Sequence, residues 1–241
     1  MQAVILAGGL GTRLGTLTRD VPKPMMPVAG KPYLEHQLRW LSKQGITNIL
    51  LLTGYLGEQI QAYFGNGSGL GLRIQYSREQ TPMGTGGSLR DASGLLAEQF
   101  LLIYGDSYLP IDYCDVIHIF QASKRRGLMV VYDNALGDTS VRNNVAIDGG
   151  LVTRYDKSAA DAAGLRFVEA GILVFQRSIV DLIPPHGPIS LEEQVFPILI
   201  AQGQMIAYAT TQRFYDIGTP ERLRFIEEFV GHDHHPDTFP N

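Results

Sequence analysis

The sequence predicts an α/β fold with a mixed, mostly parallel central sheet that is flanked by helices. Three apolar runs support this prediction: one around Val4 and Ile5, one over residues 48–53, and an alternating one over residues 72–76. Segments with helical periodicity separate these runs, and a strand–helix–strand rhythm is typical of parallel sheets with right-handed crossovers. Ligands bind such sheets at the carboxyl ends of the strands, so the residues that follow each run are candidates for function.

The predicted helices lie between these runs. The first helix presents Leu34, Leu38 and Leu41 at the i, i+4, i+7 spacing of a single apolar face, and Gly45 is a typical helix end. A second helix is expected over residues 58–64. Each helix therefore has room to cross from one strand of the sheet to the next.

The second half of the chain has a different pattern, in which strands follow strands. A strand is expected over residues 128–132, and residues 143–155 are typical of a hairpin whose turn is Asp148-Gly149-Gly150. We therefore expect a small antiparallel part in this half.

The chain is predicted to form one domain over residues 1–230, because no linker rich in Ser, Pro or charge interrupts it. Its two halves are expected to be residues 1–127 and residues 128–230. Residues 231–241 are expected to be a flexible tail. Three of the six histidines lie in this tail beside two acids, but terminal polar segments rarely pack, so we predict no functional metal site there.

One helix start in the last third combines several polar residues. Ser190 and Glu193 form a capping box, and Pro197 should kink or split the helix that follows. Glu192 and Glu193 are therefore interpreted as structural residues. The last helix is expected to begin at Pro220.

The composition excludes several classes of protein. A net charge of −4 and a pI near 5.8 argue against a nucleic-acid partner, because binding to phosphate backbones generally needs a basic surface. The single cysteine, Cys114, excludes an intrachain disulfide and suits a reducing cytoplasm. No apolar run approaches about 18 residues and no leader is recognisable, so we expect a soluble cytoplasmic protein without a membrane partner.

The first apolar run ends in a glycine-rich loop that contains Gly8, Gly9 and Gly11. Without Cβ atoms, the backbone can turn sharply there and direct several N–H groups at a phosphate oxygen. Arg13 and Lys23 add two cations. A plain βα turn is the alternative for three glycines alone. The spacing fits neither the Rossmann dinucleotide motif, which needs an acid about 20 residues on, nor the Walker A motif, which ends in Gly-Lys-Ser/Thr.

A carboxylate follows the strand expected over residues 100–104, at Asp106. At the carboxyl end of a strand, such a group is well placed to bind a divalent cation, and an Asp-initiated turn is the alternative. Asp112 and Asp115 precede a helical pattern and are interpreted as residues of a helix N-terminus.

Two stretches of the chain closely resemble the signature of the sugar-1-phosphate nucleotidylyltransferases: Ala-Gly-Gly-Leu-Gly-Thr-Arg-Leu at residues 7–14 and Pro-Lys-Pro-Met at residues 22–25. The resemblance continues, in order, over essentially the whole chain. It implies a GT-A/Rossmann-like fold and an enzyme that transfers a nucleotidyl group from an NTP to a sugar 1-phosphate, with release of pyrophosphate. It also implies Mg²⁺ as cofactor, a nucleotide-binding first half and a sugar-phosphate-binding second half.

The resemblance assigns roles to individual residues. Arg13 and Lys23 are the expected catalytic residues, and the expected metal ligands are Asp106 and Asp216. The expected nucleotide-binding residues are Leu6, Ala7, Gly8, Gly9, Gly11, Thr12, Arg13, Glu79, Pro82, Gly84, Thr85 and Asp106. The expected sugar-phosphate-binding residues are Asn144, Lys157, Glu169 and Gly171. Around Lys157 the chain departs from the family pattern, because Asp156 replaces the usual Glu and Ser158 the usual proline.

Within this family, the chain most resembles the D-glycero-α-D-manno-heptose 1-phosphate guanylyltransferases. Three stretches carry this resemblance: A-G-G-L-G-T-R-L, M-G-T-G-G-S and F-x-D-I-G-T-P-E. The expected donor is therefore GTP, and the expected acceptor is that heptose 1-phosphate. Mannose-1-phosphate guanylyltransferases, and short uridylyltransferases acting on N-acetylmuramate 1-phosphate or glucose 1-phosphate, are the alternatives. The oligomeric state stays open, with a homo-oligomer as one alternative.

Two other classes of protein share part of this pattern. A nucleotide-sugar-binding regulator would keep the glycine loop but lose a metal carboxylate or Lys23, and a dinucleotide-binding oxidoreductase would need a ribose-binding acid that is missing here. Because Lys23, Asp106 and Asp216 are all present, we predict an enzyme.

Overall fold

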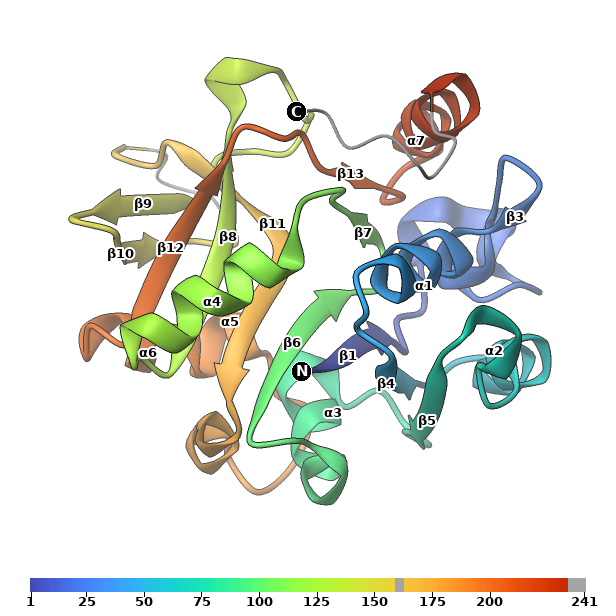
Figure 1. The fold of residues 1–241 in the computed structure, drawn as a ribbon, viewed down its shortest axis with the longest axis horizontal. Coiled ribbons are helices and arrows are strands. Elements are labelled where there is room, and N and C mark those ends of the chain that lie inside the picture. The colour runs from blue at the N-terminus through green and yellow to red at the C-terminus, as the bar shows by residue number, and fades with distance from the viewer. Residues whose placement is uncertain (159–162, 234–241) are drawn as a thin grey trace.

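The computed structural model describes residues 1–158 and 163–233, without the side chains of Arg13, Thr16, His232 and Asp233. Its centre is a nine-stranded sheet with the order β5-β4-β1-β6-β11-β8-β12-β10-β9 (Figure 1). In chain order, these strands are β1 (Gln2–Ala7), β4 (Asn48–Thr53), β5 (Arg73–Arg78), β6 (Gln99–Tyr104), β8 (Gly127–Asp133), β9 (Val145–Asp148), β10 (Leu151–Tyr155), β11 (Phe167–Gln176) and β12 (Met205–Thr210).

The sheet is parallel in the first half and mixed in the second. β1 pairs in parallel with β4 and β6, and β4 pairs in parallel with β5. β11 then lies antiparallel to both β6 and β8, and so joins the two halves. β12 is parallel to β8, whereas β9 and β10 form the antiparallel hairpin predicted at residues 148–150. The predicted fold class, a mixed and mostly parallel sheet with a small antiparallel part, is confirmed.

Helices cover both faces of the sheet (Figure 1). The helices α1 (Tyr33–Lys43), α2 (Gly57–Phe64) and α4 (Tyr113–Ser123) pack in one buried cluster with Ile5 of β1. The helices α3 (Gly84–Asp91), α5 (Leu191–Gln194) and α6 (Phe196–Ala201) pack in a second cluster with Val4. Successive strand residues point to opposite faces, so one apolar strand supplies both cores.

The last helix, α7 (Pro220–Asp233), brings the end of the chain onto the segment that follows the glycine loop. Its Ile226 belongs to a third buried cluster with Leu14, Met26 and Tyr33. Two short pairings lie in the same region: β2 (Pro27–Val28) with β3 (Lys31–Pro32), and β7 (Ser107–Tyr108) with β13 (Tyr215–Asp216). Residues from both ends of the chain therefore meet at one edge of the sheet.

Several local predictions agree with the structure. Gly45, with φ +72°, follows the end of α1, and the Asp112 side chain caps α4 by accepting from the backbone N–H of Cys114. The helix after Ser190 is split, since α5 ends at Gln194 and α6 starts at Phe196. The strand expected to end near residue 76 continues to Arg78. Within the described ranges, no helix has the length and apolar character needed to cross a membrane.

Candidate active site

A cavity of about 650 Å³ opens at the carboxyl ends of β1 and β6. Its wall combines residues of the parallel half with residues of β10, β11 and α7. The predicted residues that line it are Leu6, Ala7, Gly8, Gly9, Gly11, Thr12, Lys23, Glu79, Pro82, Gly84, Thr85, Asp106, Asn144, Lys157, Glu169 and Asp216. The nucleotide, metal and acceptor candidates therefore share one cavity.

The cavity is also lined by residues that the sequence did not predict, and two predicted residues are not part of its lining as described. The lining residues to which the sequence assigned no ligand role are Leu10, Pro24, Leu52, Ser88, Tyr104, Gly105, Ser107, Val141, Tyr155, Glu192, Phe214, Gly218 and Arg222. Gly171 lies outside the lining, and the side chain of Arg13 lies outside the described atoms.

The loop after β1 needs glycine for reasons of packing. Gly11 has φ +64°, and a Cβ atom there would lie 3.1 Å from the Cβ of Lys23. At Gly8, a Cβ atom would lie 3.1 Å from a carboxylate oxygen of Glu79 and 3.3 Å from the backbone nitrogen of Gly54. The hydroxyl of Thr18 donates to the Gly11 carbonyl at 3.1 Å. The loop is thus held closely against its neighbours, with its backbone facing the cavity.

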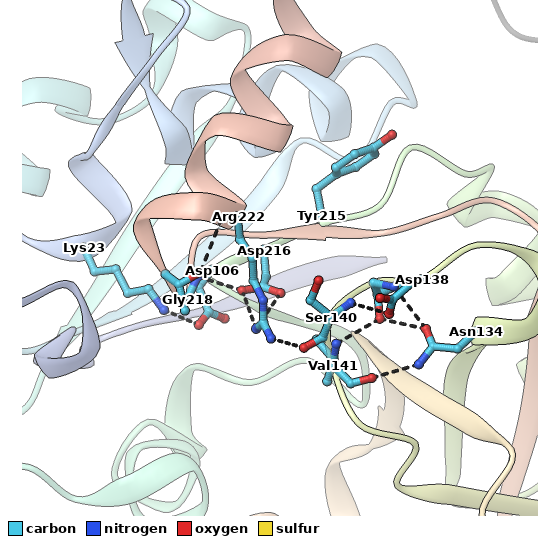
Figure 2. A network of polar contacts seen from close by, with 12 residues as sticks. Lys23, Asp106, Asn134, Asp138, Ser140, Val141, Tyr215, Asp216, Gly218 and Arg222 are labelled. Carbon is cyan, nitrogen blue, oxygen red and sulfur yellow. Dashed lines mark hydrogen bonds and ion pairs between the residues drawn. The ribbon is translucent and has the colours of Figure 1, made fainter.

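Lys23 and Asp106 form an ion pair inside the cavity, with 2.5 Å between the Lys23 Nζ and the Asp106 Oδ2 (Figure 2). Lys23 is only 9% exposed and lies between two prolines, which restrict its backbone. Asp106 follows β6, and the preceding Gly105 allows the chain to pass the Leu6 carbonyl, which a Cβ atom would approach to 2.5 Å. Lys23 is therefore presented from a stiff segment, and Asp106 from a turn that packs closely against the end of β1.

Asp216 reaches the same place through a short strand pairing. β13 pairs with β7, so that Asp216 lies opposite Ser107, and the backbone N–H of Ile217 donates to the Asp106 carbonyl at 3.1 Å. The N–H of Gly218 donates to the Asp216 Oδ1 at 2.6 Å, which orients the carboxylate. Arg222 contacts both oxygens of Asp216 at 3.2 Å (Figure 2).

These two carboxylates fit a hard dication. Burial raises the pKa of Asp216, an effect that Arg222 opposes and Asp106 increases. Two carboxylates so close together need cations nearby, and carboxylate oxygens are the ligands that Mg²⁺ prefers. Among the described residues there is no cluster of three or more His, Cys, Asp or Glu able to hold a metal. The remaining ligands of such an ion would be substrate oxygens or water.

Glu169 lines the cavity from β11. Its backbone N–H donates to the Asn144 Oδ1 at 2.9 Å, and its own carboxylate accepts from the N–H of Gly171 at 3.0 Å. Burial and the charge of Glu192 raise the pKa of Glu169 to about 8. At neutral pH, this group is therefore mostly a neutral carboxylic acid, which can donate a hydrogen bond as well as accept one.

Glu192 is a member of the site that the sequence analysis interpreted as structural only. It is 5% exposed, and its carboxylate accepts from Ser190, Thr85 and Tyr104 at 2.6 to 2.8 Å. The Lys157 Nζ lies 3.6 Å away. Burial acts to raise the pKa of Glu192, but the hydrogen bond from Ser190 and the charge of Lys157 prevail and lower it. Glu192 is thus an ionised, buried partner of Lys157.

The N-cap part of the predicted capping box is confirmed, because the Ser190 hydroxyl accepts from the Glu193 N–H at 3.3 Å. A second signal was present in the sequence. Glu192, Phe196 and Leu199 recur at i, i+4 and i+7, and all three are buried. This spacing places Glu192 on the inner face of the helix and Glu193 on the outer one.

The stretch of residues 79–88 is held by its own contacts. The Glu79 carboxylate accepts from the Ser88 hydroxyl at 2.6 Å and from the Met83 N–H at 3.2 Å, so it stabilises the turn before α3. A Cβ atom at Gly84 would lie 2.5 Å from the Ile189 carbonyl oxygen. Glycine at this position therefore makes room for the backbone at Ile189.

Gly171 has a structural role in this arrangement. Its φ is +77°, and a Cβ atom would lie 2.3 Å from the Ser107 Oγ. It falls where the pairing of β11 with β8 shifts register, between Glu169 and Leu173. Gly171 therefore lets β11 pass Ser107 while Glu169 turns toward the cavity.

The chain belongs to the nucleotidyl transferase family, whose model matches residues 2–232. This match confirms the resemblance found in the sequence. It covers both halves of the sheet and α7, and thus all the elements that build the cavity.

Relatives within the family carry more specific names. The chain is 43% identical over 225 residues to the D-glycero-α-D-manno-heptose 1-phosphate guanylyltransferase of Campylobacter jejuni, covering 92% of this chain and 96% of that protein. It is 36% identical to the mannose-1-phosphate guanylyltransferase of Mycobacterium tuberculosis, with 92% of this chain covered but only 62% of that protein's length. The crystal structure of HddC from Yersinia pseudotuberculosis complexed with GMP-PN has a TM-score of 0.78 at 28% identity, covering 95% of this chain and 99% of that one.

The raised pKa of Glu169 predicts a dependence of stability on pH. Since Glu169 binds its proton more tightly in the folded protein, its contribution is complete below its usual pKa and is lost as the pH rises toward about 8. The free energy of unfolding should therefore fall between about pH 4.5 and pH 8 more steeply in the wild type than in Glu169→Gln. Urea unfolding at several pH values measures this difference, and parallel profiles would contradict it.

The packing of Gly171 predicts a large loss of stability on substitution. Gly150→Ala is the matched control, because Gly150 has φ +78° but nothing within 4 Å of a Cβ atom. The control should lose only about 1 kcal/mol, from backbone strain. Gly171→Ala should lose at least about 2 kcal/mol more, because of the clash with Ser107. Chemical unfolding measures both losses of free energy. If Gly171→Ala and Gly150→Ala lost equal amounts, the clash with Ser107 would be shown to relax without cost.

Proposed function

We propose that this protein transfers a guanylyl group from GTP to D-glycero-α-D-manno-heptose 1-phosphate and releases pyrophosphate. The observation that carries the proposal is the pair of carboxylates, Asp106 and Asp216, which shares one cavity with the glycine loop, Lys23 and Lys157. The name of the Campylobacter jejuni relative supports the choice of donor and acceptor, because the two chains match over nearly their full lengths.

The first half, residues 1–127, would bind the nucleotide. The amides of the glycine loop would contact the triphosphate, and Arg13 would neutralise the departing pyrophosphate. Lys23 would exchange its contact with Asp106 for the phosphates as they react. Since two anions must approach each other in this reaction, alignment and charge neutralisation would supply most of the catalysis.

The second half, residues 128–230, would bind the sugar phosphate. Lys157, held near Glu192, would contact the acceptor phosphate, and Asn144 and Glu169 would contact sugar hydroxyls. The acceptor phosphate is already ionised at neutral pH, so it would attack the α-phosphorus without a protein nucleophile. Glu169, as a neutral acid, would donate a hydrogen bond to the sugar without repelling that phosphate.

Asp106 and Asp216 would hold Mg²⁺. A bound dication would supply charge neutralisation and alignment of the triphosphate. We assign the protein to the cytoplasm, where nucleotides are available and Cys114 stays reduced. We expect neither nucleic acid nor membrane as a partner, and the formation of a homo-oligomer stays open.

Mannose 1-phosphate is the second candidate acceptor. The observation that favours it is the 36% identity with the mannose-1-phosphate guanylyltransferase of Mycobacterium tuberculosis. The two acceptors share the sugar-1-phosphate group that Lys157 would recognise, so the candidates differ only in the sugar.

The metal assignment predicts that Asp106→Asn and Asp216→Asn each lower kcat by at least about 100-fold, because a neutral amide is a poor ligand for a hard dication. EDTA should abolish turnover, and added Mg²⁺ should restore it. Asp148→Asn, in the exposed β9–β10 turn, is the control and should keep the wild-type rate. The rate of pyrophosphate release measures turnover of the three variants and of the wild type with EDTA and with added Mg²⁺. Turnover in EDTA, or a near-normal rate in either site variant, would contradict the assignment.

The donor and acceptor are tested by kcat/KM for five nucleotides with heptose 1-phosphate and mannose 1-phosphate. We expect GTP to exceed UTP and dTTP by about tenfold or more, because a base that leaves buried N–H or C=O groups unpaired costs about 1 to 3 kcal/mol per group. The heptose should be the better acceptor. A preference for UTP or dTTP with each acceptor would refute guanylyl transfer, and a preference for mannose 1-phosphate would favour the second candidate.

A further inference from the structure

Arg222 joins two parts of the site that are distant in the sequence. Its Nη1 contacts both carboxylate oxygens of Asp216 at 3.2 Å, and its Nη2 donates to the backbone carbonyl of Ser140 (Figure 2). Asp216 belongs to the carboxylate pair, whereas Ser140 lies in the loop between β8 and β9. One guanidinium therefore bridges a metal-ligand candidate and a loop of the acceptor half.

The loop of residues 138–141 has few other polar anchors. Asp138 accepts from the Ser140 N–H at 2.8 Å, and Asn134 bonds Thr139 and Val141, so these contacts are local. Among the described residues, Arg222 is the one side chain from outside residues 134–143 that hydrogen-bonds this loop. Val141 lines the cavity, so a displacement of the loop would change the shape of the cavity.

The backbone of the loop is strained where Arg222 binds it. Ser140 has φ +60°, a conformation that residues other than glycine rarely adopt and that persists only where surrounding contacts hold it. This conformation presents the Ser140 carbonyl to Arg222. The loop is thus expected to relax when that contact is lost.

The contact between Arg222 and Asp216 is not saturated. One nitrogen is shared between two oxygens at 3.2 Å, which is longer than the usual 2.7 to 2.9 Å of charge-assisted hydrogen bonds. The buried Nε of Arg222 has no acceptor in the structure as described. A guanidinium bound in this way can change partners more readily than one held by a bidentate pair.

We propose that Arg222 is a positioning residue that couples occupancy of the metal site to the acceptor-side loop. Without a dication, Arg222 balances the charge of Asp216 and holds residues 138–141 against the site. When a dication binds Asp216, Arg222 would be repelled by the added positive charge, its contact with Asp216 would weaken, and the loop would be released. This inference rests on the proposed function in one respect, because it takes Asp216 as a metal ligand.

Coupling of this kind would favour an order of events in the reaction. The loop carrying Val141 would stay in place until the dication arrives with the nucleotide, and only then would the acceptor side adjust. A sugar phosphate would thus meet the adjusted cavity once the donor is bound. The arrangement is local, since it needs only one side chain to change partners.

Hydrogen exchange of the full-length protein tests the proposal without reference to turnover. The measured segment is residues 134–143, with Mg²⁺ alone as the probe and ionic-strength-matched KCl as its control. Arg222→Met removes the bridge, and Arg222→Lys keeps the charge but lacks the fork that spans Asp216 and Ser140. Arg224→Met is the matched control, because Arg224 is exposed on the same helix. Thermal unfolding checks that every variant is folded.

Without Mg²⁺, exchange in this segment should be about tenfold faster in both Arg222 variants than in the wild type, since a hydrogen bond from a charged group is lost. Arg224→Met should match the wild type. Mg²⁺ should raise wild-type exchange toward the level of Arg222→Met and leave that variant unchanged. The coupling would be overturned if the wild type and Arg222→Met exchanged at equal rates without Mg²⁺. It would also be overturned if Mg²⁺ left the exchange rate of the wild type unchanged, or changed it equally in both proteins.

The result is separable from the test of the proposed function. Asp216→Asn should raise exchange without Mg²⁺, as the Arg222 variants do, because it removes the charge that holds the guanidinium. If this pattern is found but no nucleotidyl transfer occurs, the proposed function fails and the coupling stands. If guanylyl transfer is found but exchange follows none of these expectations, the coupling alone fails.

Discussion

The pairing of β7 with β13 is the constraint on which the rest of the site depends. It aligns Ser107 with Asp216, and so holds two carboxylates, Asp106 and Asp216, at one cavity. Like charges repel strongly where water is scarce, and burial further disfavours the ionised form of Asp216. Lys23 and Arg222 offset this repulsion by pairing with one carboxylate each. The site is thus balanced in charge and suited to exchange these partners for a dication and phosphates.

A third ion pair, between Lys157 and Glu192, lies at the same cavity. Lys157 lies 3.6 Å from Glu192, which three hydroxyl groups also stabilise. Each of the three cations is therefore held by a carboxylate at the cavity. In the proposed reaction, this placement would reduce the reorganisation that is needed. Because phosphate groups carry more negative charge than one carboxylate, they can compete for these cations. The proposed coupling through Arg222 follows from this kind of exchange, since its guanidinium also holds a loop.

Much of the site could be predicted because its motifs are contiguous. The glycine loop and the carboxylate of Asp106 each follow directly from an apolar strand, and turn chemistry at a strand end is local. Two predictions are incomplete because they concern residues whose contacts lie far away in the sequence. The capping pattern assigns Glu192 only to a helix start, although its helical spacing also predicts an inward side chain. The resemblance assigns Gly171 to the sugar phosphate, and the structure adds that its missing Cβ makes room for Ser107, which lies on another strand.

The sequence by itself determined the fold class, several of the longer strands and helices, the glycine loop and the family, because apolar periodicity and short motifs depend on neighbouring residues. Only the tertiary structure decided which charges meet. The pKa of Glu169 is raised by burial and by Glu192, and the pKa of Asp216 is raised by burial and by Asp106 and lowered by Arg222. Burial and these distances between charged groups arise from contacts between segments that are far apart in the chain. Such contacts form only when β11 joins the two halves of the sheet.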